Sequence, residues 1–162
     1  MEFYPEVLLP IFQKTEQLDA LLRKKYGKIL TNYSVSEMHC LDYIGKMEKP
    51  NVTKLAIALN LTKAGTSKML KRLLQRKAVK TFTDCNNKKE IYYSLTAVGK
   101  KIFAAHAILH KNWNSYTEQF LDNCPLIQVT NTIKLLKKYS YYLQQLLDNL
   151  QKEENYASQS YT

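Results

Sequence analysis

The sequence contains little glycine, proline and cysteine, with 4, 4 and 3 residues of each among its 162. So few turn-forming residues argue against a barrel or a sandwich, whose many short strands need frequent turns. Hydrophobic residues still make up 45% of the chain, which excludes a disordered protein and allows a buried core. We therefore expect a mainly α-helical protein that folds as one domain over residues 1–162.

Signals for export and for membrane insertion are also missing. Cys40, Cys85 and Cys124 are widely spaced, so neither a disulfide framework nor a thiolate zinc site is expected. No apolar run reaches about 18 residues, and the N-terminus lacks a basic stretch followed by an apolar segment. These absences predict a cytoplasmic protein with no membrane partner.

Common enzyme motifs are absent as well. The chain contains no glycine-rich phosphate loop, no His-Glu-x-x-His motif and no Gly-x-Ser-x-Gly motif. A metal-dependent hydrolase that uses the histidines is the alternative from another functional class. Because the sequence offers no catalytic constellation, we predict that the protein is not an enzyme.

Positive charge is concentrated in the middle of the chain. The net charge of +10 divides into +1 over residues 1–60, +9 over residues 61–101 and 0 over residues 102–162. A protein that binds a polyanion gathers its charge in this way, since each phosphate that it neutralises releases counterions. The distribution predicts a nucleic-acid partner, with a solvated lysine-rich surface and a non-specific nucleic-acid-binding protein as alternatives.

Apolar residues at spacings of three and four predict two helices before Pro50. The first spans about residues 5–25 and ends at Gly27, because glycine is favoured just after a helix. Ser36 is expected to cap the second helix, which stops before Pro50.

The next segments predict a winged helix-turn-helix. A short helix over residues 52–59 is followed by Asn60, which tolerates the left-handed conformation of a tight turn, and Thr62 caps a helix that reaches about residue 76. Two β-prone runs, residues 79–84 and 90–95, then flank a polar tip and predict a hairpin. In this arrangement the second helix enters the major groove and the hairpin reaches the flanking backbone.

Residue types on this predicted recognition helix and hairpin fit contact with double-stranded DNA. Small residues near the start of the helix let it approach base edges, and the basic residues suit phosphates or guanine acceptors. The residues predicted to contact DNA are Thr53, Lys63, Ala64, Gly65, Thr66, Ser67, Lys68, Lys71, Arg72, Asn86, Asn87, Lys88 and Lys89.

Two long helices, over residues 97–121 and 126–150, follow the hairpin. The second carries an apolar stripe at near-heptad spacing that is longer than a small domain can cover, although a plain core helix would carry a similar stripe. We therefore expect a homodimer, held by helices at about residues 5–30 and 97–151 that flank a winged helix-turn-helix at about residues 34–96. The polar tail from Glu153 is expected to be frayed.

The stretch from Val52 to Thr96, together with Gly99, resembles the MarR (multiple antibiotic resistance regulator) family. The resemblance implies a transcriptional regulator, in most cases a repressor, whose dimer reads the half-sites of a pseudo-palindromic operator. The chain departs from the family by having Asn60 and Lys77 where glycine is frequent. Its wing has Asp84-Cys-Asn-Asn-Lys-Lys89 where the family has Asp-x-x-Asp-Arg-Arg, so the aspartate–arginine pair that stiffens the wing is weakened.

The histidines suggest what the protein could sense. His106 and His110 are four positions apart, so they share a helix face and can ligate one metal ion. The resemblance adds His39, because the zinc-sensing branch of the family has three histidine ligands at matching positions and a carboxylate near the end of the first helix. Here the nearest acids are Glu16 and Asp19, and basic residues follow them. Regulatory zinc binding and a structural or small-molecule-contacting role both stay open.

Overall fold

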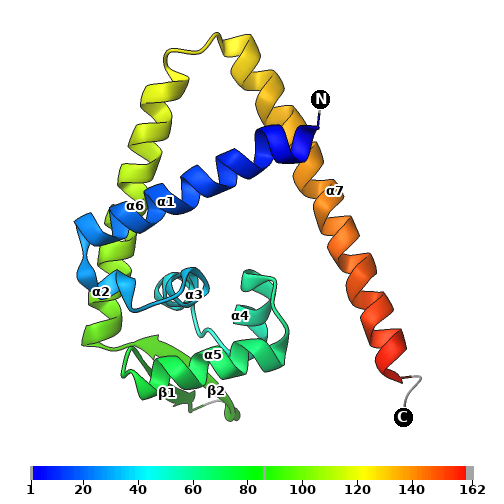
Figure 1. Cartoon of the computed structure of the whole chain (residues 1–162). Coiled ribbons are helices and arrows are strands. Elements are labelled where there is room, and N and C mark those ends of the chain that lie inside the picture. Colours follow the sequence, from blue (N-terminus) through cyan, green and yellow to red (C-terminus); the bar gives the residue numbers. More distant parts are fainter. Residues whose placement is uncertain (1, 86, 160–162) are drawn as a thin grey trace. The chain divides into compact units, whose positions relative to one another are not determined.

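The computed structural model describes residues 2–85 and 87–159, with residues 87, 88 and 154–159 described by their backbone alone. The described chain is mainly helical with one two-stranded sheet, as predicted (Figure 1). It divides into two compact units, Met1–Trp113 and Asn114–Thr162. The elements are η1 (Tyr4–Leu8), α1 (Leu9–Tyr26), α2 (Lys28–Thr31), α3 (Val35–Lys46), α4 (Val52–Leu59), α5 (Lys63–Gln75), β1 (Val79–Asp84), β2 (Asn87–Leu95), α6 (Ala97–Leu121) and α7 (Leu126–Gln159).

The tight turn between α4 and α5 is confirmed. Asn60 has φ 52° and ψ 48°, in the left-handed region, and its backbone N–H donates to the end of α4. The Thr62 hydroxyl then accepts a hydrogen bond from the Gly65 N–H at 3.1 Å and begins α5. Lys77, which stands where the family often has glycine, is also left-handed, with φ 55°. A lysine therefore occupies a conformation that glycine adopts at lower cost.

The predicted cap of α3 was wrong by two positions. Ser34, and not Ser36, caps the helix: its side chain accepts from the Glu37 N–H at 3.2 Å, and the Glu37 carboxylate accepts from the Ser34 N–H at 3.0 Å. This reciprocal pair satisfies two backbone donors that the first helical turn leaves free. The Ser-x-x-Glu pattern was present in the sequence and identifies this cap.

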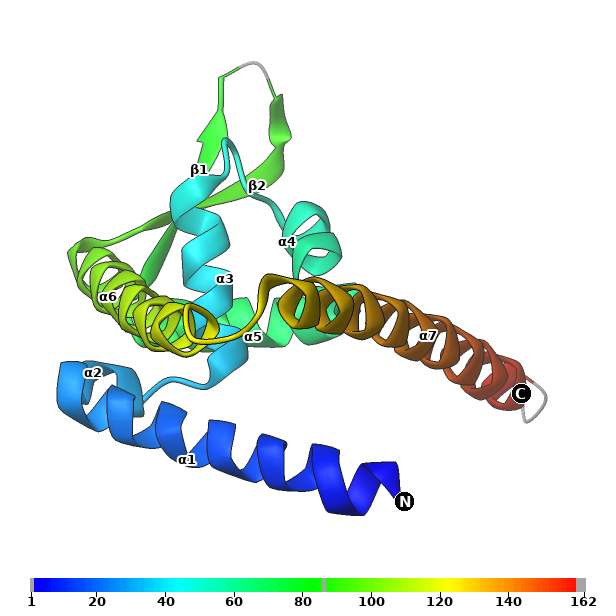
Figure 2. The ribbon, with the colours of Figure 1, turned by 90° about the horizontal axis from the view of Figure 1, so that it is seen from above.

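The hairpin pairs β1 with β2 in an antiparallel register, with Val79 opposite Leu95 and Phe82 opposite Tyr92. Strand β2 begins at Asn87, three residues before the predicted Glu90. Figure 2 shows the two strands extending beyond α3 and α4 as a wing. The register becomes irregular between Phe82 and Asp84, close to the tip.

The core of the first unit joins α3, α4 and α5 to the start of α6. Leu41, Leu55, Leu73 and Ile102 are fully buried in it. Helix α6 begins so close to the preceding chain that a Cβ atom on Gly99 would lie 2.0 Å from the Ala78 carbonyl oxygen. Glycine is needed at this position because the close approach leaves no space for a side chain.

The described part of the second unit has no such core. Among residues 114–153, no described side chain is buried, and large apolar side chains stay exposed along α7. The prediction of a frayed tail was wrong in its extent, because α7 continues to Gln159 through residues with good helix propensity. No helix among the described residues is apolar and long enough to cross a bilayer.

Candidate nucleic-acid interface

Helix α5 presents most of the predicted contact residues to solvent. Its first turn is exposed at Lys63, Ala64 and Gly65, which leaves a small, basic surface beside the turn. Ser67 is half-buried at the edge of this surface. The remaining predicted residues that are exposed on α4 and α5 are Thr53, Lys68, Lys71 and Arg72.

Thr66 does not belong to this surface. Its side chain is fully buried, and its hydroxyl donates to the Thr62 carbonyl at 3.0 Å. Position 66 shares a helix face with the buried Leu70 and Leu73, so the helical period turns it toward the core. The prediction that the Thr66 side chain contacts DNA was therefore wrong, because the side chain is buried in the core.

Arg72 is partly engaged within the protein. Its Nε lies 3.2 Å from Oε1 of Glu37, and Nη1 of Arg76 lies 3.2 Å from Oε2 of the same carboxylate. Glu37 is only 4% exposed, so its charge is removed from water and stabilised by these two guanidinium groups. Arg76 also donates to the Asn32 carbonyl at 2.8 Å. The C-terminal half of α5 is thus fixed to the start of α3, an arrangement that sequence reasoning missed.

Of the four residues of the wing that are predicted to contact DNA, the structure describes the side chain of one. Lys89 is exposed on β2. Asn86 lies outside the described residues, and the side chains of Asn87 and Lys88 are not described, so their contacts with DNA stay predictions.

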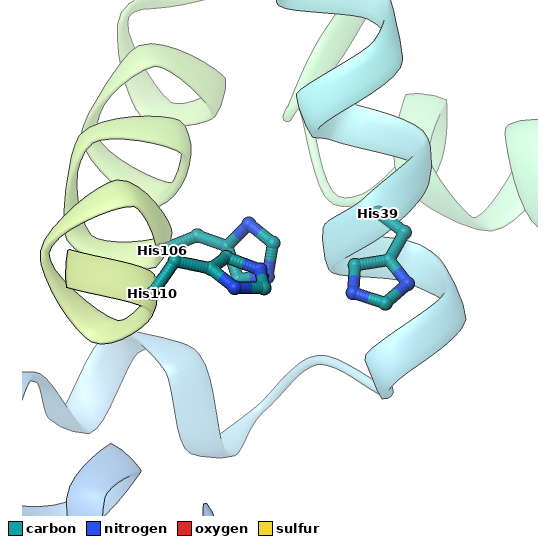
Figure 3. Close-up of side chains that lie close together, drawn as sticks. All are labelled: His39, His106 and His110. Carbon is teal, nitrogen blue, oxygen red and sulfur yellow. The ribbon is translucent and has the colours of Figure 1, made fainter. Parts of the chain in front are cut away.

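The three histidines meet between α3 and α6. Figure 3 shows the His39 ring on α3 facing the rings of His106 and His110 on α6. One nitrogen from each ring lies within 4.8 Å of the other two, and Nε2 of His106 is 3.0 Å from Nε2 of His110. His106 is buried, and its Nδ1 has no hydrogen-bond partner within the described part of the chain.

Burial favours the neutral, metal-binding form of two of these histidines, His106 and His39. It lowers the pKa of His106 to about 4, and the neighbouring His110 and His39 act in the same direction. Burial likewise lowers the pKa of His39 from its ordinary value. Neutral imidazole offers a lone pair, so His106 is in the ligating form at neutral pH.

Two carboxylates line the same cavity as the histidines. Glu16 and Asp19 of α1 border it, together with Arg23 and Trp113. The Asp19 carboxylate lies 2.7 Å from Nε of Arg23. The cavity, of about 300 Å³, is large enough for a metal ion with further ligands or for a small organic molecule. The two acids nearest to the predicted carboxylate position therefore line the cavity of the histidines.

A comparison of sequences identifies relatives. The sequence profile of the MarR family matches residues 33–91. The "HTH-type transcriptional regulator PchR" of Bacillus subtilis (strain 168) is 31% identical over 111 residues, which cover 68% of this chain and 66% of PchR. The chain spans between 51% and 66% of the length of the curated relatives that it matches.

Solved structures share the fold. Streptococcus pneumoniae FabT, crystallised in complex with DNA, aligns with a TM-score of 0.70 and 22% identity over 87% of this chain and 95% of FabT. The adhesin competence repressor AdcR of Streptococcus pyogenes aligns with a TM-score of 0.64 and 19% identity over 81% of this chain and 95% of AdcR. These similarities support the winged-helix architecture that the residues predicted.

Proposed function

Because the chain belongs to the MarR family, we propose that it is a sequence-specific DNA-binding regulator of transcription. The observation that carries this proposal is the exposed surface of α5, where small residues lie beside basic ones behind a capped tight turn. A helix of this kind fits the major groove, and the wing adds lysines for the flanking backbone. Members of this family are regulators and not enzymes, which agrees with the absence of enzyme motifs.

We further propose that the regulator acts as a homodimer. The side chains of Leu136, Leu143, Leu147 and Leu150 are between 37% and 52% exposed along α7. Such a stripe on a helix without a core of its own favours a second copy of the chain as partner. Two recognition helices held about 34 to 36 Å apart would then read a pseudo-palindrome. A dimer bound across a promoter would exclude other proteins, so repression is the proposed outcome.

Selection of duplexes from a random pool tests sequence specificity. We expect Ser67→Ala to weaken binding to the selected duplex by about 1 kcal/mol or more, roughly fivefold, and to leave random DNA unaffected, because Ser67 can reach base edges. Lys88→Ala should weaken both duplexes by a similar factor, since backbone contacts carry no sequence information. Fluorescence anisotropy titrations measure both affinities.

The choice of Ser67 avoids a complication at Arg72. Replacing Arg72 would also leave the buried Glu37 with one partner fewer, so a loss of affinity could come from altered packing of α5. An equal loss of affinity for selected and random DNA in Ser67→Ala would contradict the prediction that Ser67 contacts base edges. A pool from which no preferred duplex emerges would favour non-specific binding.

We propose zinc as the effector at His39, His106 and His110. The residues fit a zinc ion, because three imidazole nitrogens converge and the buried Nδ1 of His106 has no other partner among the described residues. Glu16 or Asp19 would supply a fourth ligand. Bound zinc would link α3 to α6, and it regulates DNA binding only if it favours one arrangement of the recognition helices. A small molecule in the same cavity is the alternative effector.

Calorimetry with zinc tests this site. We expect one zinc ion per protomer with a Kd below about 1 μM, and a loss of at least roughly 100-fold in His106→Ala, since a buried ligand is removed. Cys85→Ser is the control, because it removes an exposed thiol far from the cluster in sequence and should bind zinc normally. Zinc should change the affinity of the wild type for the selected duplex and leave that of His106→Ala unchanged. Weak zinc binding by the wild type would instead favour the organic ligand.

A further inference from the structure

Both strands of the wing are fastened to the connection between α3 and α4, away from the recognition helix. Lys49 forms an ion pair with Asp84, the last residue of β1. On the other strand, the Tyr93 N–H donates to the Pro50 carbonyl at 3.0 Å, and Asn51 donates to Glu90 at 3.4 Å. Both strands of the hairpin are therefore held by one short segment.

Lys49 is placed for this contact by an unusual backbone. Its φ of 48° lies in the left-handed region, which residues with a side chain rarely adopt. The Nζ of Lys54 donates to the Lys49 carbonyl at 3.3 Å and supports this conformation. Asp84 lies where the strand register becomes irregular, near the tip. A contact at this position restricts the direction of the wing more than one at the base would.

We infer that Lys49 is a positioning residue for the wing and not a phosphate-contacting lysine. The inference rests on the proposed DNA binding. The Asp84 carboxylate accepts a hydrogen bond from the Lys49 ammonium group and raises its pKa, so Lys49 stays charged. Its charge is directed at Asp84, which is itself mostly covered. The lysine therefore acts on DNA through the orientation of the hairpin.

The variant Asp84→Asn distinguishes orientation of the wing from long-range electrostatic attraction to DNA. Removing a negative charge near DNA should strengthen binding if only long-range attraction matters. If the pair orients the wing, the same change should weaken binding to the selected duplex, by roughly two- to tenfold. Lys49→Met should weaken it by a similar factor, and the double variant should be no worse than either single variant, because both remove one interaction.

The salt dependence of affinity provides the second readout. A lysine that contacts phosphate contributes about 0.9 to the slope of log K against log salt in each subunit. We expect Lys49→Met to leave the slope of log K against log salt unchanged. Lys49→Arg should bind the selected duplex as tightly as the wild type, because arginine keeps the ion pair with Asp84. Lys46→Met is the matched control, because Lys46 forms a similar ion pair with Asp42 at 2.6 Å, but within α3. It should not change affinity.

Hydrogen exchange of the DNA-free protein tests the positioning role of Lys49 independently of the proposed DNA binding. Amides of β1 and β2 should exchange faster in Lys49→Met and in Asp84→Asn than in the wild type or Lys46→Met. Unchanged exchange, or tighter DNA binding by Asp84→Asn, would overturn the positioning role. A wild-type protein that binds no duplex, while exchange still responds to Lys49→Met, would overturn the proposed function and retain the structural anchor.

Discussion

Raising the salt concentration from 50 to 200 mM should weaken binding to the selected duplex by about 10³ to 10⁵-fold. The reason is the density of basic side chains on one segment, which carries a net charge of +9 over residues 61–101. Exposed Lys63, Lys68, Lys71 and Lys89 from two protomers would give roughly 6 to 10 phosphate contacts, each contributing about −0.9 to the slope of log K against log salt. Anisotropy titrations at several salt concentrations measure this slope.

Variants that remove one lysine each show which residues contribute to the slope of log K against log salt. Lys68→Ala should reduce its magnitude by about 1.8, because one contact is lost in each subunit. Lys138→Ala is the matched control: Lys138 is exposed on α7, in the second unit, and carries the same charge. It should leave the slope unchanged. A nearly flat plot for the wild type would refute DNA binding through this surface.

Introducing charge into the apolar stripe of α7 should release monomers and greatly weaken operator binding. Leu143 and Leu147 are 37% and 48% exposed in the single chain and lie on one face of the helix. Burying two glutamates in a dimer seam costs more than the association provides, so the double variant Leu143→Glu, Leu147→Glu should be monomeric. Loss of bivalent binding should lower the affinity for the selected duplex by about 10² to 10⁴-fold.

The control for this variant is Asn149→Glu, which adds charge on the opposite side of the same helix. It should stay dimeric and bind normally. Sedimentation equilibrium gives the mass of each protein, and circular dichroism shows whether the helices persist. A wild-type protein that is monomeric at micromolar concentration and still binds the duplex would contradict the dimer.

Features that depend on a few neighbouring residues were predictable from the sequence. Helix α4, the left-handed turn at Asn60 and the cap at Thr62 were each predicted at the correct residue. Caps and turns depend on which side chain can reach a backbone N–H two or three positions away, and sequence spacing defines that reach. The spacing of His106 and His110 placed them on one helix face for the same reason.

The ends of α3 and α7 were predicted less accurately from the sequence than the turn at Asn60. Ser36 and Ser34 are both possible caps, and only the Glu three residues after Ser34 separates them. The extent of α7 was underestimated because the polar residues at its end favour both a helix and a disordered tail.

Which charged groups meet could be decided only by the tertiary structure. The sequence placed Arg72 on a DNA-facing surface, but packing of α5 against α3 brings it to Glu37, 35 positions away. Folding likewise pairs Lys49 with Asp84 and brings Glu16 and Asp19 to the cavity of the histidines. An ion pair requires two groups within about 4 Å, and that distance depends on how separate elements pack, which local spacing does not encode.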